Sequence, residues 1–401
     1  MSKPLPVETN RTLQVPQGEF ELQRNPCDDS LQAWDAADEF LLNHLHDIQV
    51  LSRHGKLLIL NDAFGALAVA LADHPVYSWN DSFLAQQGLR ENLVANGYAA
   101  DEVKTNSAID LPSVAVDCVL IKVPKTLALL EHQLYALRAI LHRDTRIIAA
   151  GMARNIHTTT LQLFESILGP ATTTRARKKS RLILVERDHS MNEGQSPYPD
   201  SYELEVDRSY RILNHASLFS RDRLDQGSRL LLEHMPVEPR YRRIVDLGCG
   251  NGVIGIIAAA FNPAASLLFC DESFMAIASA EVNFRAAFAL SRQAEFRVTD
   301  CLQGFANASQ DLVLLNPPFH QQHSVGDAVA WRMLKDARRV LVAGGELRLV
   351  GNRHLGYHAK LKKLFGNCET IACNNKFVIL QAVKNQAITP AGSTPQRFDS
   401  E

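Results

Sequence analysis

The chain has 401 residues, enough for two or three domains, and its 46% hydrophobic and 21% charged residues are typical of a globular protein. Its 42 Lys and Arg against 44 Asp and Glu give a net charge of -2, which excludes a uniformly basic nucleic-acid coat but allows a local basic surface. No apolar run approaches the roughly 20 residues that span a bilayer. The polar N-terminus has no signal-like apolar region, and the seven cysteines form no CxxC pair. We therefore expect a cytoplasmic protein with reduced thiols and without a metal site.

The first half of the chain alternates short apolar runs with helical patterns. Strands are expected at 56–60, 76–79, 114–121, 146–150 and 181–185, and helices at 66–72, 82–95 and 126–140. Strands separated by helices predict βαβ units and a mostly parallel sheet.

A break follows between 188 and 207. This segment holds Gly, Ser, two Pro and six acidic residues, with no Lys or Arg. No helical or strand period persists through it, so it is interpreted as a linker.

The second half repeats the alternation of the first. Strands are expected at 243–246, 266–270, 296–298, 311–315 and 346–350, and helices at 253–261, 274–289 and 328–341. A final pair of runs, 370–373 and 377–383, predicts an antiparallel hairpin. The Pro/Ser/Thr-rich residues 386–401 are expected to be a frayed tail.

The two halves also align with each other. The segment 80–83 (NDSF) matches 271–274 (DESF), and at the same offset Asn92 falls on Asn283. Residues 117–125 (DCVLIKVPK) match 311–319 (DLVLLNPPF). The pattern predicts an internal duplication of about 190 residues per copy.

The strongest local signal is the run DLGCGNG at 246–252, which follows a strand and opens a helix. Its alternating glycines let the backbone turn tightly and approach a ligand, and the helix behind them directs its N-terminal amides at that ligand. A dinucleotide fingerprint would need glycine at the position of Val253. The spacing with a preceding acid suits S-adenosylmethionine instead.

Three further polar signals follow at strand ends. Asp271 is placed to take two ribose hydroxyls, and Asp300 to accept from an adenine amino group. The run Asn316-Pro317-Pro318-Phe319 ends the next strand. This order matches ligand binding at the carboxyl ends of parallel strands.

Together, the loop 246–252 and the run NPPF resemble class I S-adenosylmethionine-dependent methyltransferases that modify exocyclic amines. The longer runs NPPFHQQHSVGDAVAW and GNRHLGYHAKLKKLFGNCETIACNNKFVILQAVK resemble the bacterial rRNA guanine-N(2)-methyltransferases, the 23S enzymes more than the 16S enzymes. The resemblance implies two tandem class I, Rossmann-like α/β methyltransferase folds, the N-terminal one degenerate. It also implies S-adenosylmethionine as cofactor and rRNA, with 23S favoured, as partner.

The same resemblance assigns roles to individual residues. The cofactor would be held by Asp246, Gly248, Cys249, Gly250, Asn251, Gly252, Asp271 and Asp300. The side chain of Asn316 and the carbonyl of Pro317 would accept the hydrogens of a guanine 2-amino group, which localises the nitrogen lone pair. Pro318 belongs to the same catalytic run, and Phe319 would stack on the flipped base. No strong general base is required, because methylation raises the acidity of the leaving proton.

The first copy has lost these groups. Its equivalent of NPPF is the run KVPK from Lys122 to Lys125, Asn80 stands in place of Asp271, and one glycine remains in its loop. It is therefore not expected to bind cofactor. Its expected role is to bind RNA through cationic side chains that contact phosphates, which are Lys122, Lys125, Arg175, Arg177, Lys178 and Lys179.

The expected organisation is a degenerate RNA-binding domain at 1–187, a linker at 188–207, a catalytic domain at 208–385 and a tail at 386–401. The expected activity is methylation of the 2-amino group of one 23S rRNA guanine. The residues leave open the same chemistry on 16S rRNA, DNA adenine or a protein amide. They also leave open an RNA-binding assembly factor with vestigial cofactor binding.

Overall fold

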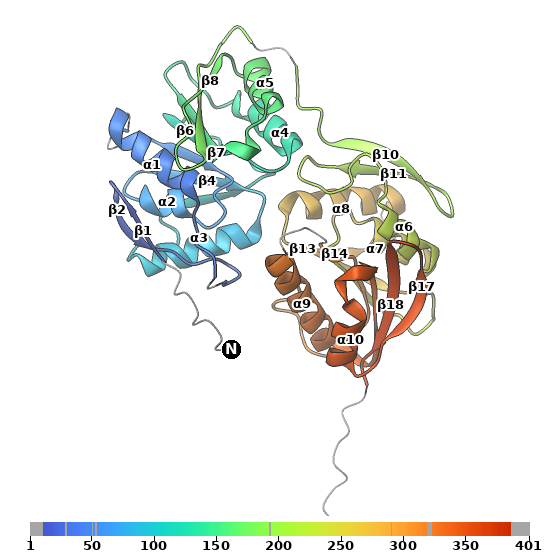
Figure 1. Cartoon of the computed structure of the whole chain (residues 1–401). Coiled ribbons are helices and arrows are strands. Elements are labelled where there is room, and N and C mark those ends of the chain that lie inside the picture. The colour runs from blue at the N-terminus through green and yellow to red at the C-terminus, as the bar shows by residue number, and fades with distance from the viewer. Residues whose placement is uncertain are drawn as a thin grey trace, which may run out of the picture.

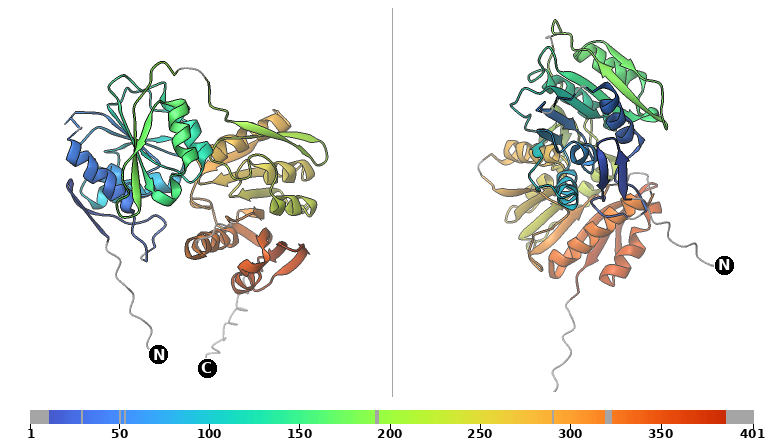
Figure 2. Two further views of the ribbon diagram at one scale, coloured as in Figure 1. Left: turned by 45° about the horizontal axis from the view of Figure 1, so that its top comes forward. Right: turned by 90° about the vertical axis from the view of Figure 1, so that its left-hand side faces the viewer.

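The structure is a computed structural model that describes residues 11–385 apart from 29, 50, 53, 192–193, 290 and 319–322. Each half of the chain forms one seven-stranded mixed sheet with helices on both faces, and the two halves lie side by side (Figures 1 and 2). The expected tail at 386–401 lies outside the described residues. Among the described residues, no helix is long and apolar enough to cross a membrane.

The first sheet has the strand order β5-β4-β3-β6-β7-β9-β8. Its strands are β3 (Leu57–Leu60), β4 (Val76–Asn80), β5 (Lys104–Ser107), β6 (Cys118–Lys122), β7 (Arg146–Met152), β8 (Ala171–Thr173) and β9 (Ser180–Val185). The helices of this half are α1 (Ala36–Ile48), α2 (Ala66–Ala70), α3 (Phe83–Ala95), α4 (Leu127–Leu137) and α5 (Thr158–Ile167), with a 3-10 turn at Ala153–Asn155.

The second sheet has the order β14-β13-β12-β15-β16-β18-β17. Its strands are β12 (Arg243–Leu247), β13 (Ser266–Asp271), β14 (Ala294–Val298), β15 (Gln310–Leu315), β16 (Leu341–Asn352), β17 (Glu369–Cys373) and β18 (Phe377–Val383). The helices of this half are α6 (Gln226–Glu233), α7 (Val253–Phe261), α8 (Phe274–Phe288), α9 (His323–Val340) and α10 (Tyr357–Phe365), with a 3-10 turn at Arg353–Leu355.

The two sheets have the same topology, strand for strand. In each, the first five strands of the spatial order pair in parallel, and the last two pairings are antiparallel. The buried clusters repeat as well: α1 to α3 pack on one face of the first sheet and α4 and α5 on the other, as α6 to α8 and α9 and α10 do on the second. The predicted tandem α/β fold is therefore confirmed, and so is the closing antiparallel hairpin.

The segment interpreted as a linker is partly a strand, which corrects that prediction. β10 (Asp200–Glu205) pairs antiparallel with β11 (Ser209–Asn214). The alternation of apolar and polar residues in this hairpin is short. Leu204 on one strand and Tyr210 and Ile212 on the other bury their side chains against the second half. An equivalent hairpin, β1 (Thr12–Val15) and β2 (Gly18–Glu21), precedes the first sheet.

Matched asparagines hold the two hairpins in the same way. Asn283 donates to the carbonyl oxygens of Leu213 and Asn251, at 2.8 and 2.9 Å, and accepts from the Leu213 amide. Asn92 makes the same three bonds to the carbonyl oxygens of Gln23 and Phe64 and to the Gln23 amide. The offset between Asn92 and Asn283 thus marks a duplicated hydrogen-bond network that includes the hairpins.

The two halves meet through the turns that follow β4 and β13. The Ser82 hydroxyl donates to Glu272 at 2.5 Å, and the Ser273 hydroxyl donates to Asp81 at 2.6 Å. Ser82 and Ser273 also form an antiparallel bridge. Because both turns lie at the carboxyl ends of parallel strands, the ligand-binding edges of the two sheets lie near each other.

Candidate functional site

The glycine loop joins β12 to α7. Gly250 has a φ of 54°, and a Cβ added there would meet nothing within 4 Å. Gly252 has a φ of 80°, and an added Cβ would lie 2.8 Å from the Cβ of Ala280 on α8. Gly250 therefore keeps the loop open to a ligand, whereas Gly252 permits close helix packing.

Asp246 lies near the end of β12, beneath this loop, and is 1% exposed. Its Oδ2 accepts from the Gly255 amide at 2.8 Å, while its Oδ1 is buried and has no hydrogen-bond partner among the described residues. Burial, and secondarily the charge of Asp271, raises the pKa of Asp246 to about 8. A buried carboxylate with a free oxygen and a raised pKa fits a cationic ligand group, such as the amino group of S-adenosylmethionine.

Asp271 ends the neighbouring strand β13. Its Oδ2 accepts from the Gly250 amide and its Oδ1 from the Ser273 amide, both at 3.0 Å. Asp271 therefore holds the glycine loop in position, and it lies at the strand end where a ribose acceptor was expected. Asp300, two residues beyond β14, forms an ion pair with Arg332 of α9.

Two loop residues that the resemblance included among the cofactor ligands make contacts within the protein. The Cys249 side chain is buried in the apolar cluster below α7. The Asn251 amide donates to Asn214 Oδ1 at 2.9 Å and to the Tyr202 hydroxyl at 3.4 Å. Asn251 thereby ties the loop to the β10–β11 hairpin. Gly248 also lines this loop, and an added Cβ there would lie 3.0 Å from the Met333 methyl group.

Asn316 follows β15, and its amide group has a defined orientation. Its Nδ2 donates to the Ser228 hydroxyl at 2.9 Å, and its Oδ1 is buried without a partner among the described residues. The fixed NH₂ end leaves the oxygen end as a ready acceptor. Pro317 is buried and Pro318 is exposed, whereas Phe319 lies outside the described residues.

The contact between Ser228 and Asn316 was not predicted from the sequence. Asp225 is the cap of α6: its side chain accepts from the amides of Gly227 and Ser228, at 2.8 and 3.1 Å. The cap fixes the first turn of α6 and so places the Ser228 hydroxyl. The signal in the sequence was the spacing between Asp225 and Ser228, but nothing in it names Asn316 as a partner.

Asn352, at the end of β16, was also missed. Its Oδ1 is buried and has no hydrogen-bond partner among the described residues. Val350 belongs to the cluster on the α6 side of the sheet, and alternate strand residues share a face, so Asn352 lies on that side too. Because Leu314 belongs to the same cluster, Asn316 shares this face, and β15 and β16 are neighbours.

The same positions in the first half hold an ion pair. Asp35 caps α1 as Asp225 caps α6, and Asp38 therefore corresponds to Ser228. The Lys122 ammonium, at the place of Asn316, lies 2.5 Å from Asp38 and 2.8 Å from Asp35. Burial alone would lower the pKa of Lys122, but the two carboxylates hold it above its usual value. The phosphate contact expected for Lys122 is therefore corrected to an internal ion pair.

The other expected RNA contacts are exposed. Lys125 follows β6, and the remaining four cations lie in the turn between β8 and β9: Arg175, Arg177, Lys178 and Lys179. Lys178 pairs with Glu39 of α1 at 2.6 Å, while 70% of its side chain stays exposed. No group of three or more His, Cys, Asp or Glu side chains that could hold a metal occurs in the described part of the chain.

Comparisons with known proteins give one consistent result. The model of the RLMG N-terminal domain matches residues 10–189, and that of the methyltransferase small domain matches residues 209–381. The ribosomal RNA large subunit methyltransferase G of Streptomyces coelicolor is 48% identical over 92% of this chain and 99% of its own length. The protein of the same name from Erwinia tasmaniensis is 52% identical over 88% of this chain and 93% of its own.

A solved structure has the same fold. The 16S rRNA N2 G1207 methyltransferase (RsmC) of T. Thermophilus, in complex with AdoMet and guanosine, matches with a TM-score of 0.73. The match covers 93% of this chain and 97% of that chain, at 22% sequence identity. At that identity the likeness extends to the fold of both halves together and not to the substrate.

Proposed function

Because the chain belongs to the family of the ribosomal RNA large subunit methyltransferases G, we propose that it methylates the 2-amino group of one guanine in 23S rRNA, with S-adenosylmethionine as methyl donor. The observation that carries the chemistry is the buried Oδ1 of Asn316, which has no hydrogen-bond partner in the described part of the chain and lies at a strand end next to the glycine loop. The assignment of 23S rRNA as the substrate rests on the names of the two large-subunit relatives.

The cofactor would lie over the carboxyl ends of β12 to β14. Asp246 Oδ1 would hold the amino group of the cofactor, the loop at Gly250 would lie close to the amino-acid part of the cofactor, and Asp271 would hold its ribose. Asp300 would take the adenine amino group in place of part of its contact with Arg332. When bound, S-adenosylmethionine supplies an activated sulfonium methyl group, so the protein has mainly to align and desolvate the reactants.

The chain's own residues prepare the guanine nitrogen. The lone pair of a 2-amino group is delocalised into the ring, and acceptors for its hydrogens localise it. Asn316 Oδ1 and the Pro317 carbonyl oxygen are these acceptors, and Ser228 keeps the Asn316 amide from turning its NH₂ end inward. Asn352 Oδ1 lies on the same face and is a further acceptor for the base edge. The proton is lost after methylation, when the nitrogen is more acidic.

The first half would bind RNA and would not bind cofactor. We assign it residues 1–187, with catalysis in 208–385, and we place the start of the second structural copy at the β10 hairpin. Its RNA contacts would be Lys125 and the exposed cations of the β8–β9 turn, Arg175 to Lys179. Replacing these cations with glutamine should lower the slope of the salt dependence of RNA binding by about 0.7 for each phosphate that is no longer neutralised, as for a single strand.

The test of the proposed chemistry is Asn316→Ala. Methyl transfer to 23S rRNA should fall by about two orders of magnitude, since this substitution removes a positioned acceptor that acts in the transition state. Cofactor affinity, measured by calorimetry, should stay within twofold of the parent chain. Equal losses of activity and cofactor affinity would show that Asn316 is structural and would contradict the mechanism.

The runner-up substrate is 16S rRNA. The fold shared with the 16S enzyme allows it, but that likeness is 22% in sequence, against about half for the two large-subunit relatives. An RNA-binding assembly factor with vestigial cofactor binding is disfavoured, because Asp246 and Asn316 each keep a buried oxygen that no described residue hydrogen-bonds.

A further inference from the structure

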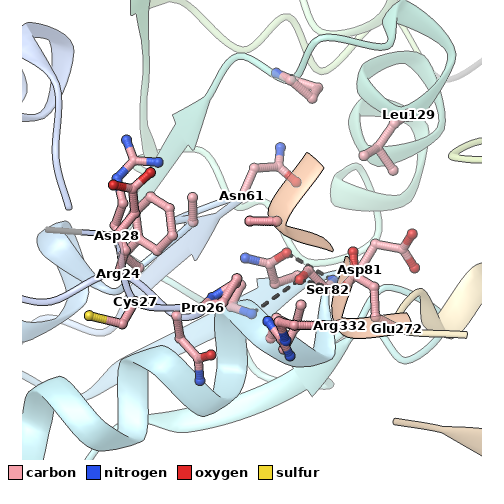
Figure 3. Close-up of a pocket in the computed structure, with 18 of the residues that line it drawn as sticks. Arg24, Pro26, Cys27, Asp28, Asn61, Asp81, Ser82, Leu129, Glu272 and Arg332 are labelled. Atoms are coloured by element: carbon pink, nitrogen blue, oxygen red, sulfur yellow. Dashed lines mark hydrogen bonds between the residues drawn. The ribbon is translucent and has the colours of Figure 1, made fainter. Parts of the chain in front are cut away.

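A cavity of about 750 Å³ lies between the two halves, over the loop of the first half that corresponds to the glycine loop of the second (Figure 3). Gly65 precedes α2 with a φ of 81°, as Gly252 precedes α7 with a φ of 80°, so these two residues correspond. Asn61 and Ala63 of the cavity wall therefore correspond to Gly248 and Gly250. The cavity is the first half's counterpart of the cofactor site, and its size is that of a small-ligand pocket.

The walls of this cavity are not built for S-adenosylmethionine. Asn61 brings a side chain to the position of a loop glycine, and its amide bonds to Gln133 at 2.9 Å and to the Lys122 carbonyl at 3.1 Å. Ile59 stands on β3 where Asp246 stands on β12, as the pairings of the two central strands show. The acid that would hold a cationic amino group is thus replaced by an aliphatic side chain.

The cavity does contain a stacking platform. The guanidinium group of Arg24 lies over the ring of Phe64, 4.7 Å from its centroid, and the Arg24 Nε donates to the Gln32 carbonyl at 2.7 Å. Leu84 and Leu129 add apolar wall. Unstacked bases bind on aromatic rings and on arginine planes, and an arginine beside them attracts the adjoining phosphate.

The acidic groups of the cavity wall lie mainly opposite Arg24. Figure 3 shows Asp81 and Glu272 on the side away from Arg24, and Asp28 beside it. Asp81 and Glu272 accept from the serine hydroxyls between the halves. Burial raises the pKa of Asp81 to about 6 and that of Glu272 to about 7, so near neutral pH Asp81 stays mostly ionised and Glu272 is partly protonated. A phosphate is therefore disfavoured on the side of Asp81 and Glu272, and Arg24 is the cation of this wall that can pair with one, in competition with Asp28.

The cavity also adjoins the catalytic half. Ala328 and Arg332 of α9 line it, and Arg332 is the ion-pair partner of Asp300 at the proposed adenine position. One side-chain pair thus separates the cavity from the cofactor region. The cavity and the cofactor region are therefore neighbours, within reach of one bound RNA strand.

We propose that this cavity binds an unpaired nucleotide of the substrate RNA that flanks the target guanine, with its base stacked on the Arg24–Phe64 pair and its phosphate at Arg24. The proposal rests on the proposed function, because it takes the substrate to be RNA. In the first half, the pocket that corresponds to the cofactor site would then bind a base instead. The bound base would fix the register of the RNA strand at the active site.

The test fills the cavity from an exposed position. Ala63→Trp places a large ring in it, and Val94→Trp, on the exposed face of α3, is the matched control. Binding of a labelled, single-stranded, 12-nucleotide RNA of mixed sequence, measured by fluorescence anisotropy, should weaken at least tenfold in Ala63→Trp and less than twofold in Val94→Trp. Cofactor affinity by calorimetry should be unchanged in both, because neither position touches the second half's loop.

A second pair of variants keeps the test decisive if Ala63→Trp does not fold. Arg24→Gln should weaken binding of the same RNA about fivefold and reduce the salt slope by about 0.7, whereas Arg90→Gln on α3 should change neither. Equal RNA affinity in each variant and its control would overturn the proposal. So would two equivalents of S-adenosylmethionine per parent chain, if one of them no longer binds to Ala63→Trp.

The outcomes separate this proposal from the proposed function. If the parent chain methylates 23S rRNA and Ala63→Trp retains full RNA affinity, only the cavity proposal fails. If the parent chain leaves 23S rRNA unmethylated while oligonucleotide binding still depends on Ala63 and Arg24, only the assigned substrate fails.

Discussion

The hydrogen bond between Ser228 and Asn316 gives the sharpest prediction about catalysis. Ser228→Ala removes one oxygen atom from a side chain that is 4% exposed. The cap of α6 survives, because Asp225 accepts from the main-chain amide of residue 228, which alanine retains. The substitution therefore takes away the 2.9 Å hydrogen bond to Asn316 Nδ2 and little else.

The size of the effect follows from what the bond does. A neutral hydrogen bond contributes about 0.5–1.5 kcal/mol net, and about 1.4 kcal/mol is a factor of ten in rate. Without Ser228, the Asn316 amide can rotate and present its NH₂ end to the base. We expect kcat to fall about tenfold, with KM for RNA and cofactor affinity within twofold of the parent values.

The assay is single-turnover methyl transfer to 23S rRNA at saturating enzyme, together with calorimetric titration of S-adenosylmethionine. Ser228→Thr, which keeps the hydroxyl, is the matched control and should recover most of the rate. An unchanged rate in Ser228→Ala would refute the orienting role of this bond. A loss of cofactor affinity equal to the loss of rate would place Ser228 in the cofactor site instead.

Three further outcomes follow from the buried charges. Cofactor affinity should weaken as the pH falls below about 8, because a bound cation favours ionised Asp246 and the carboxyl group must release its proton. Calorimetry in buffers of different ionisation enthalpy should detect this proton release, and Asp246→Asn should abolish the release. Lys122→Asn should lower the free energy of unfolding by about 3 kcal/mol in urea titrations, since it leaves Asp38 buried without its cation, and adding Asp38→Ser, the residue found at the matching position 228, should restore most of it. Burial raises the folded-state pKa of Asp81 to about 6, so its stabilising protonated form is lost as the pH rises from about 4 to 6. Asp81→Asn should remove about 3 kcal/mol of that pH dependence, and an identical pH profile for the variant would contradict the assignment.

Most of the fold could be predicted from the sequence, because its signals are local. The strand ends at Asp246 and Asp271 are marked by apolar runs that stop at polar residues, and the repeat of NDSF as DESF revealed the duplication. The β10–β11 hairpin could not be predicted. Its apolar alternation spans a few residues within an acidic segment, and what stabilises it is packing on the second half.

The site was predicted in part, and the remainder depends on contacts between distant segments. Lys122 was interpreted as a phosphate contact because cations replace the NPPF run in the first copy, but its partners Asp38 and Asp35, in α1 and at its cap, are 84 and 87 residues away. Ser228 and Asn316 are 88 residues apart. No local sequence pattern predicts contacts between residues so far apart in the chain. They become visible when matching positions of the two folded halves are compared.

The most direct test of the central claim is methyl transfer from tritiated S-adenosylmethionine to rRNA of a strain that lacks this gene, with the 23S and 16S species separated. The account predicts label on a single guanine of 23S rRNA, at its 2-amino group, and none with Asn316→Ala. Label on 16S rRNA, or no label in either RNA by a chain that binds the cofactor, would contradict it.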